Sequence, residues 1–172
     1  MSILDVFVKS VFLLYFFTMQ NPIEEKHSLT VVGIDIRTAN DPDKAPIHIP
    51  QMWQRFYAEN IFEKIPNKAS TDIVALYCDY ESDYLAPYTF VLGCFINELP
   101  KELPEGLVIK TLPASQYVVY KAKGKQPEAL IDAWGKIWRE ADRRSYTGDF
   151  EIYGTRYFGQ PEQEVDIFIA IQ

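Results

Sequence analysis

Residues 72–96 read DIVALYCDYESDYLAPYTFVLGCFI, a pattern typical of two strands joined by a loop. The segments 72–80 and 88–96 are rich in aromatic and β-branched residues, which favour strands. The intervening segment ESDYLAP has the polar residues and the proline that are common in connecting loops. We therefore predict a β-hairpin over residues 72–96.

The sequence before this hairpin predicts a strand followed by a helix. SLTVVGIDIRT, residues 28–38, is strand-like, and NDPDKAPIHIP, residues 40–50, is typical of a turn-rich loop. Pro50 fits the first turn of a helix that ends near Pro66. Its apolar residues follow helical spacing: Met52, Trp53, Phe56 and Tyr57. The first half of the chain is therefore strand, helix, strand, strand.

The same order of elements follows the connector ELPKELPEGL, residues 98–107. Residues 107–124 are predicted to be extended, with a break at Pro113. Pro127 opens a helix whose apolar stripe has a clear helical period: Leu130, Trp134, Ile137, Trp138 and Ala141. DFEIYG and EVDIFIAI, joined by TRYFGQPEQ, are predicted to be the last two strands.

The repeated order predicts an α+β fold built from two strand–helix–strand–strand repeats, at about 28–97 and 107–172. Each repeat is too short to be stable alone, so the two are expected to share one core about a pseudo-two-fold axis. We expect an antiparallel sheet with the helices packed on it and a ligand cleft between the repeats. This assigns residues 19–172 to a single domain.

The first 18 residues differ in character from the rest of the chain. The segment VFVKSVFLLYFF is strongly apolar but short for a bilayer span, so no stable membrane insertion is expected. It is also a poor signal peptide, because Asp5 precedes the first cation, Lys9, and no cleavage site of small residues follows. Two interpretations remain open: an accessory extension with Met19 as the true start, or an amphipathic helix packed on the domain.

Composition and charge argue against several classes of function. The net charge of −7 disfavours nucleic-acid binding. The basic cluster Arg139, Arg143 and Arg144 is interpreted as a favourable interaction with a helix dipole. Two cysteines within apolar strand patterns suggest free thiols and a cytoplasmic protein. The two histidines lie far apart and no glycine-rich phosphate loop appears, so neither a metal site nor a cofactor is predicted.

The strand patterns at the C-terminus predict a binding site around Glu151. Strand residues alternate between two faces, and Val165, Ile167, Ile169 and Ile171 form one apolar face. If Phe150 and Ile152 join that face, the opposite face collects Glu151, Tyr153, Phe168 and Asp166. A carboxylate among aromatic rings is typical of a cation site. The alternative is that Glu151 is simply solvated on an exposed face.

Several separated segments resemble the GyrI-like effector-binding domain, which is found in AraC-type and MerR-type regulators and in stand-alone proteins, some from integron cassettes. The segments are YESDYLAPYTFVLGCFI, LPEGLVIKTLPASQYVVY, AWGKIW, and YTGDFEIYG with EVDIFIAI. They follow the family's order, and the resemblance extends over about residues 28–172. The resemblance implies two strand–helix–strand–strand units with a ligand cleft between them.

The resemblance also implies a function and a set of site residues. In family members that sense lipophilic cations, a buried glutamate in the penultimate strand meets the positive charge, and Glu151 matches its position. The aromatic wall carried over by resemblance is Tyr153, Phe168, Tyr88, Phe90, Trp53 and Trp134. Asp166, which the strand pattern places near Glu151, is the alternative counter-charge. Because no helix-turn-helix is evident, the expected role is a stand-alone module that sequesters or senses cationic drugs or toxins.

Other roles remain open within this family. Glu151 could serve as the general acid or base of a small hydrolase. The chain could also act as a gyrase-inhibitor-like or protein-interaction module, with an unnamed protein partner or as a homodimer. A lipophilic cation binding to an aromatic cleft is the leading hypothesis, and the protein is expected not to be an enzyme.

Overall fold

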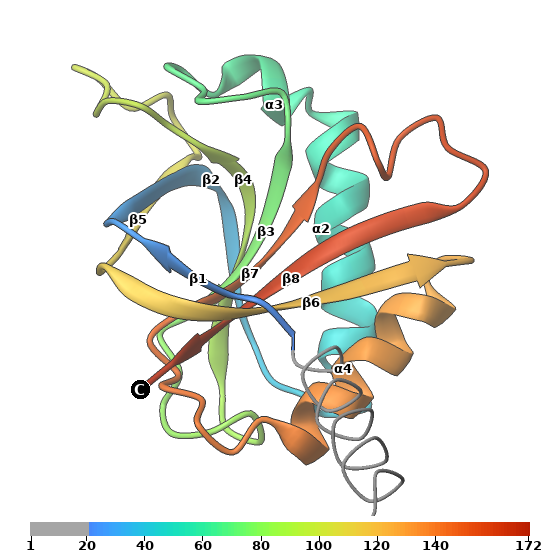
Figure 1. The fold of residues 1–172 in the computed structure, drawn as a ribbon. Coiled ribbons are helices and arrows are strands. Elements are labelled where there is room, and N and C mark those ends of the chain that lie inside the picture. Colours follow the sequence, from blue (N-terminus) through green and yellow to red (C-terminus); the bar gives the residue numbers. More distant parts are fainter. Residues whose placement is uncertain (1–20) are drawn as a thin grey trace, which may run out of the picture.

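The computed structural model describes residues 21–172 as one curled antiparallel sheet with helices packed against it (Figure 1). The elements in order are β1 (Ile23–Lys26), β2 (Leu29–Thr38), α2 (Ala45–Ala58), α3 (Ile61–Lys64), β3 (Ile73–Cys78), β4 (Tyr88–Phe95), β5 (Val108–Leu112), β6 (Ser115–Gly124), α4 (Glu128–Glu140), β7 (Asp149–Tyr153) and β8 (Gln163–Ile171). Within this described part of the chain, no helix combines the length and the apolar character that crossing a membrane would require.

The strand order confirms the predicted repeat. The sheet has eight strands in the order β1-β6-β8-β7-β3-β4-β2-β5, and every pair is antiparallel. Each repeat thus contributes three strands in an equivalent order, β2-β4-β3 and β6-β8-β7. The two repeats meet where β3 pairs with β7. The predicted α+β fold with pseudo-two-fold symmetry is therefore confirmed.

Strand β1 was not predicted, and it completes the edges of the sheet. It pairs with β6, whereas β2, which follows it in the chain, pairs with β5 (Figure 1). Both ladders keep the same register, since Ile23 faces Val118 and Leu29 faces Leu112. The chain from β1 to β2 therefore runs beside the chain from β5 to β6, and this pairing draws the two edges of the sheet toward each other.

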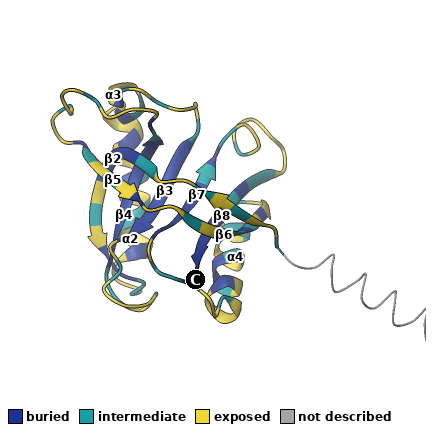
Figure 2. Cartoon of the chain, turned by 60° about the vertical axis from the view of Figure 1, so that its left-hand side comes forward, coloured by how far each residue is buried: buried dark blue, intermediate teal, exposed yellow. Residues whose placement is uncertain are grey.

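The sheet is buried on both faces, which explains the nearly continuous apolar runs of the hairpin at 72–96. One core lies between the sheet and the helices and includes Met52 and Phe56 of α2 and Ile137 of α4. A second core, on the other face, is built from strand residues such as Leu76 and Phe150. Figure 2 shows the central strands in the colour of buried residues along their length.

The predicted start of the first helix was wrong. Helix α2 begins at Ala45, so that Pro46 occupies its first turn and Pro50 lies inside the helix. The predicted end near Pro66 was also too late. The helix ends at Ala58, Asn60 adopts a left-handed conformation with φ of 50°, and α3 follows as a separate turn. The earlier start brings the segment 40–50 over the sheet, where it forms part of the cleft described below.

The second helix and the strands agree more closely with the sequence. Pro127 directly precedes α4, and Trp134 and Ile137 of its predicted stripe are buried. The predicted break at Pro113 separates β5 from β6. The predictions for residues 1–18 and for a start at Met19 lie outside the described residues, and they remain predictions.

Candidate functional site

Glu151 lies at the centre of the sheet, on the face that the helices cover. It is 1% exposed and stands opposite Ala75 of β3 and Ile167 of β8. Residues that face each other in an antiparallel pair share one side of the sheet. Glu151 therefore lies on the same face as Ile167, and the interpretation that it is a solvated strand residue is wrong.

Three aromatic side chains donate hydrogen bonds to the Glu151 carboxylate. Tyr77 Oη and Trp134 Nε1 donate to Oε1 at 2.9 and 2.6 Å, and Tyr153 Oη donates to Oε2 at 2.6 Å. The donors come from β3, α4 and β7. This arrangement supplies a buried carboxylate with hydrogen bonds from neutral groups and leaves its negative charge without a basic partner among these contacts.

Burial and hydrogen bonding act on Glu151 in opposite directions. Desolvation raises the pKa of the Glu151 carboxyl, whereas the hydrogen bonds from Tyr153, Trp134 and Tyr77 lower it, and the net direction is upward. Desolvation also raises the pKa of Tyr77 and of Tyr153 well above that of free tyrosine, and the neighbouring Glu151 adds to the effect. The two hydroxyls therefore remain protonated donors near neutral pH.

The donors to Glu151 reflect the pseudo-two-fold symmetry of the fold. Tyr77 and Tyr153 each lie two residues beyond the facing pair Ala75 and Glu151. Each tyrosine ring also meets a helix tryptophan edge-on, Trp134 at 5.0 Å from Tyr77 and Trp53 at 4.8 Å from Tyr153. Aromatic layers from both repeats therefore flank one carboxylate.

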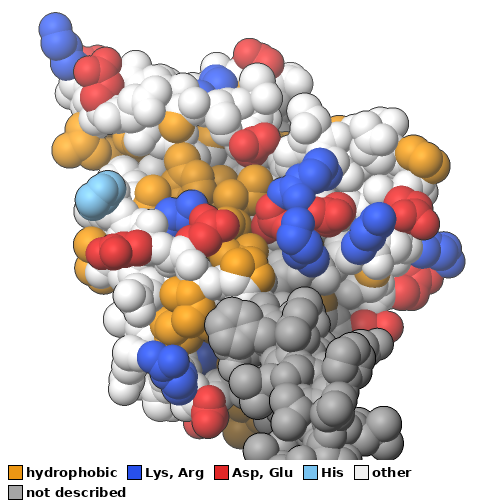
Figure 3. Space-filling view, in the orientation of Figure 1, with side chains coloured by type: hydrophobic (Ala, Val, Ile, Leu, Met, Phe, Trp, Pro, Cys, Tyr) orange, Lys and Arg blue, Asp and Glu red, His pale blue; other side chains and the backbone are white. Residues whose placement is uncertain are grey.

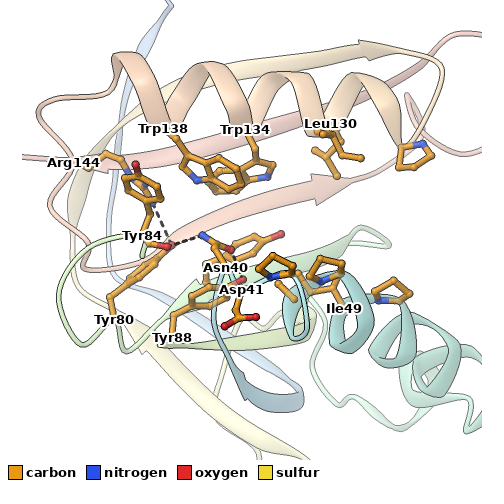
Figure 4. Close-up of a pocket in the computed structure, with 17 residues that line it drawn as sticks. Asn40, Asp41, Ile49, Tyr80, Tyr84, Tyr88, Leu130, Trp134, Trp138 and Arg144 are labelled. Atoms are coloured by element: carbon orange, nitrogen blue, oxygen red, sulfur yellow. Dashed lines mark hydrogen bonds between the residues drawn. The ribbon is translucent and has the colours of Figure 1, made fainter. Parts of the chain in front are cut away.

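A cleft of about 690 Å³ opens beside Tyr77 and Trp134. Its walls come from both repeats, and Figure 4 shows the side chains of α4 pointing toward those of the segment 40–50 and of the hairpin. The volume is in the range of small-molecule sites. The lining residues are mostly aromatic or apolar: Asn40, Asp41, Pro42, Ala45, Pro46, Ile49, Pro50, Tyr77, Tyr80, Tyr84, Tyr88, Pro127, Leu130, Ile131, Trp134, Trp138 and Arg144.

Stacked rings bridge the repeats at one end of this cleft. Tyr84, in the loop between β3 and β4, stacks on Trp138 of α4 with ring centroids 5.7 Å apart and planes at 11°. Tyr88 also lines the cleft, and its hydroxyl donates to Asn40 Oδ1 at 3.0 Å. Phe90 lies behind it, fully buried, and packs its ring against Tyr77 at 5.3 Å.

The predicted site residues on the Glu151 face of the sheet differ in whether they line the cleft. Trp134 and Tyr88 line the cleft, and Glu151 lies directly behind its wall. Tyr153 donates to Glu151 but, like Trp53 and Phe90, is not among the lining residues.

The prediction that Phe168 and Asp166 share a face with Glu151 is wrong. Phe150 pairs with Phe168 across β7 and β8, and the two rings stack at 4.6 Å in the second core. Asp166 forms ion pairs with Arg156 and Lys121 on that same face. Figure 3 shows acidic and basic side chains next to one another on the side of the molecule where β6 and β8 lie in front.

A buried ion pair beside the cleft was not predicted from the sequence. Arg144 is 5% exposed, and its Nη2 donates to Asp149 Oδ2 at 2.6 Å. Asp149 also accepts from Tyr80 Oη at 2.9 Å and from the backbone N–H of Ala170 at 2.9 Å. Arg144 lies beyond the end of α4, so its interpretation as a partner of the helix dipole was wrong.

Arg144 stays protonated within this ion pair, and Asp149 balances its charge. Desolvation lowers the pKa of the Arg144 guanidinium, but the neighbouring Asp149 and Tyr80 outweigh it and the net direction is upward. The charge of Arg144 was recognisable in the sequence. Its burial was not, because Arg144 and Asp149 flank a turn whose path the pattern of residues does not determine.

Comparison with known proteins points to one family. The family model described as Cass2, integron-associated effector binding protein, matches residues 22–171. YobU of Bacillus subtilis (strain 168), described as a transcriptional regulator, is 32% identical over 146 residues, which are 81% of this chain and 90% of YobU. The transcriptional regulator BrlR of Pseudomonas aeruginosa is 27% identical over 159 residues, which are 89% of this chain but 56% of BrlR.

Solved structures show the same fold. An integron cassette protein from the mobile metagenome of Vibrio cholerae, VCH_CASS2, has a TM-score of 0.68 and 29% identity over 90% of this chain and 97% of that one. The structure of SAV2435 bound to tetraphenylphosphonium has a TM-score of 0.74 and 21% identity, with 90% of this chain and 94% of that chain covered.

Proposed function

The chain belongs to the family of integron-associated effector binding proteins, and on that basis we propose that it binds lipophilic aromatic cations in the cleft beside Glu151. The cation lies against the rings of Tyr77 and Trp134. Glu151 supplies the counter-charge from behind these rings. The biological role is sequestration or sensing of such compounds, and binding, rather than hydrolysis, is the activity.

The observation that carries this proposal is a buried carboxylate bonded to the aromatic wall of an apolar cleft. Tyr77 and Trp134 line the cleft on one side and donate to Glu151 Oε1 on the other. A hydrogen-bonded anion behind a ring makes the ring more electron-rich, and the face of an aromatic ring already attracts cations. A cation against these rings therefore meets both ring faces and a negative charge in a site of low polarity.

A relative with the same fold supports the size and the charge of the ligand. SAV2435 has been solved with tetraphenylphosphonium, a bulky cation that carries four aryl rings. The cleft of about 690 Å³ has room for a ligand of this class, and its lining offers aromatic surfaces from two directions.

The hydrolase alternative is less well supported by the surroundings of Glu151. A general acid or base needs free access to the proton that it transfers. Glu151 instead accepts three hydrogen bonds from side chains that cover it, and it is 1% exposed. Such a carboxylate is well placed to act electrostatically and poorly placed to meet a substrate proton.

We expect tetraphenylphosphonium to bind and to change the tryptophan fluorescence, because Trp134 and Trp138 line the cleft. Tetraphenylborate has nearly the same shape and the opposite charge, so it is the matched probe. The cation is expected to bind at least about tenfold more tightly, a difference of about 1.4 kcal/mol. Fluorescence titration of both ions at one salt concentration measures the ratio.

Tryptophan variants identify which residues produce the fluorescence change. Trp53→Phe is expected to retain the fluorescence change, since Trp53 does not line the cleft, whereas Trp134→Phe combined with Trp138→Phe should lose most of it. Equal affinity for the two ions would mean that hydrophobic burial alone drives binding, and the proposed selectivity for cations would be wrong.

A further inference from the structure

Arg144 has hydrogen-bonding capacity that the rest of the site does not use. Its Nη2 donates to Asp149 at 2.6 Å and lies 3.4 Å from Tyr80 Oη. Its Nε and Nη1 are buried and have no acceptor among residues 21–172. A guanidinium carries five N–H groups, three of them on these two nitrogens, and buried donors in native proteins are nearly always paired.

Aromatic rings surround the guanidinium without satisfying these donors. The rings of Tyr146, Tyr80 and Trp134 lie 4.4, 5.8 and 5.9 Å from Arg144 Cζ. Ring faces attract the positive charge, but they are weak acceptors of N–H groups. A carboxylate or carbonyl oxygen would be a much stronger partner.

The position of Arg144 makes the cleft bipolar. Figure 4 shows Arg144 at the end of the cleft near Trp138, with Leu130 toward the other end. The indole of Trp134 connects the two charged groups, since its Nε1 donates to Glu151 Oε1 at 2.6 Å while its ring lies near Arg144. A negative and a positive group therefore flank one aromatic surface.

We propose that the cleft prefers aromatic cations that also carry a carboxylate, which Arg144 binds while the cationic rings lie on the Glu151 side of Trp134. This inference rests on the proposed function and specifies the ligand class more narrowly. For a cleft whose selectivity comes from Glu151 alone, a carboxylate on the ligand would reduce affinity, because it adds desolvation and opposes the cation's attraction to Glu151. With Arg144 in the cleft wall, a carboxylate on the ligand instead increases the affinity.

Rhodamine 110 and rhodamine 123 are a matched pair of probes. Both contain the same cationic xanthene, and they differ in having a free carboxylate or its methyl ester. We expect the wild-type protein to bind rhodamine 110 at least about fivefold more tightly, because only the carboxylate is a charged acceptor for Arg144. Fluorescence anisotropy titration of each dye gives the ratio of the two affinities.

Two variants test the role of Arg144 without leaving Asp149 alone in the core. Arg144→Met combined with Asp149→Asn removes both charges of the buried pair, and Arg144→Lys keeps the charge but loses the Nε and Nη1 donors. The double variant is expected to lose at least about tenfold in affinity for rhodamine 110 and less than twofold for rhodamine 123. Arg144→Lys should reduce the preference for rhodamine 110, and urea unfolding verifies that both variants are folded.

The outcomes separate this inference from the proposed function. Suppose that Glu151→Gln weakens the binding of rhodamine 123, but the wild type binds rhodamine 110 no more tightly than rhodamine 123. If the double variant also leaves the ratio of the two affinities unchanged, Arg144 is a structural cation and the inference is wrong. If neither dye binds to the wild type, the proposed function fails as well. A preference for rhodamine 110 that disappears in the double variant supports both.

Discussion

Glu151→Gln is expected to reduce the affinity for tetraphenylphosphonium by about thirtyfold or more, or about 2 kcal/mol. The amide has nearly the shape of the carboxylate. Its oxygen can accept from Tyr77 and Trp134, and its NH₂ group can donate to the Tyr153 hydroxyl. The variant therefore removes the negative charge behind the cleft wall and preserves the wall itself. Isothermal titration calorimetry of both proteins measures the difference.

Asp166→Asn provides the matched control for this charge removal. Asp166 lies on the same sheet, on the opposite face, where Arg156 and Lys121 pair with it. Its neutralisation should change the affinity for tetraphenylphosphonium less than twofold. A loss of affinity in Asp166→Asn together with normal binding in Glu151→Gln would mean that Asp166, and not Glu151, is the counter-charge.

Glu151→Gln also has an expected effect on the free energy of unfolding. Because the pKa of Glu151 is raised in the folded protein, its contribution to stability is fully present below the pKa of the unfolded chain and is lost as pH rises through the folded pKa. Above the folded pKa the wild type therefore carries a destabilising buried charge. Glu151→Gln should be at least as stable as the wild type at pH 7, which shows that its loss of binding does not come from unfolding.

Asp149→Asn is expected to have the larger effect on stability, with a loss of about 3–5 kcal/mol in the free energy of unfolding. Asp149 is fully buried and compensates the charge of Arg144. The asparagine oxygen can still accept from the Ala170 N–H, but the amide NH₂ then faces the donors of Arg144 and Tyr80. The variant thus leaves a buried guanidinium without its counter-ion. Urea denaturation monitored by circular dichroism measures the loss.

A second substitution distinguishes charge from packing at this pair. Adding Arg144→Met to Asp149→Asn removes the uncompensated charge, and most of the lost stability should return. Tyr80→Phe, which removes one neutral hydrogen bond to Asp149, should cost only about 1 kcal/mol. If Asp149→Asn lost less than about 1 kcal/mol, the pair would not be an important structural element of the cleft wall.

The order of elements was predictable because it depends on local patterns. The helical stripe from Leu130 to Ala141 and the strand-like runs at 72–80 and 88–96 lie where the helix and the hairpin form. The predicted strand after Ser28 and the break at Pro113 also appear in the fold. The identity of Glu151 as a buried carboxylate followed from the family resemblance, and its 1% exposure confirms it.

The faces of the sheet could not be assigned from the same patterns, because they depend on how strands far apart in the chain pair. Moving a strand by one residue transfers all of its side chains to the other face. Glu151 faces Ile167 instead of Phe168, so the aromatic partners of the carboxylate come from Tyr77 and Trp134. Tyr77 lies in a strand that is buried on both sides, where no alternation marks the face of the cleft.

The pH dependence of tetraphenylphosphonium affinity, measured by calorimetry from pH 5 to pH 8, tests most directly whether Glu151 is the counter-charge. Burial raises the pKa of Glu151, and a cation binds to the ionised form, so the affinity should fall as pH decreases through that pKa. The ligand itself does not titrate, and Glu151→Gln should bind weakly at every pH with a flat profile. A wild-type profile that is also flat, or one that Glu151→Gln reproduces, would contradict the assignment of the counter-charge to Glu151.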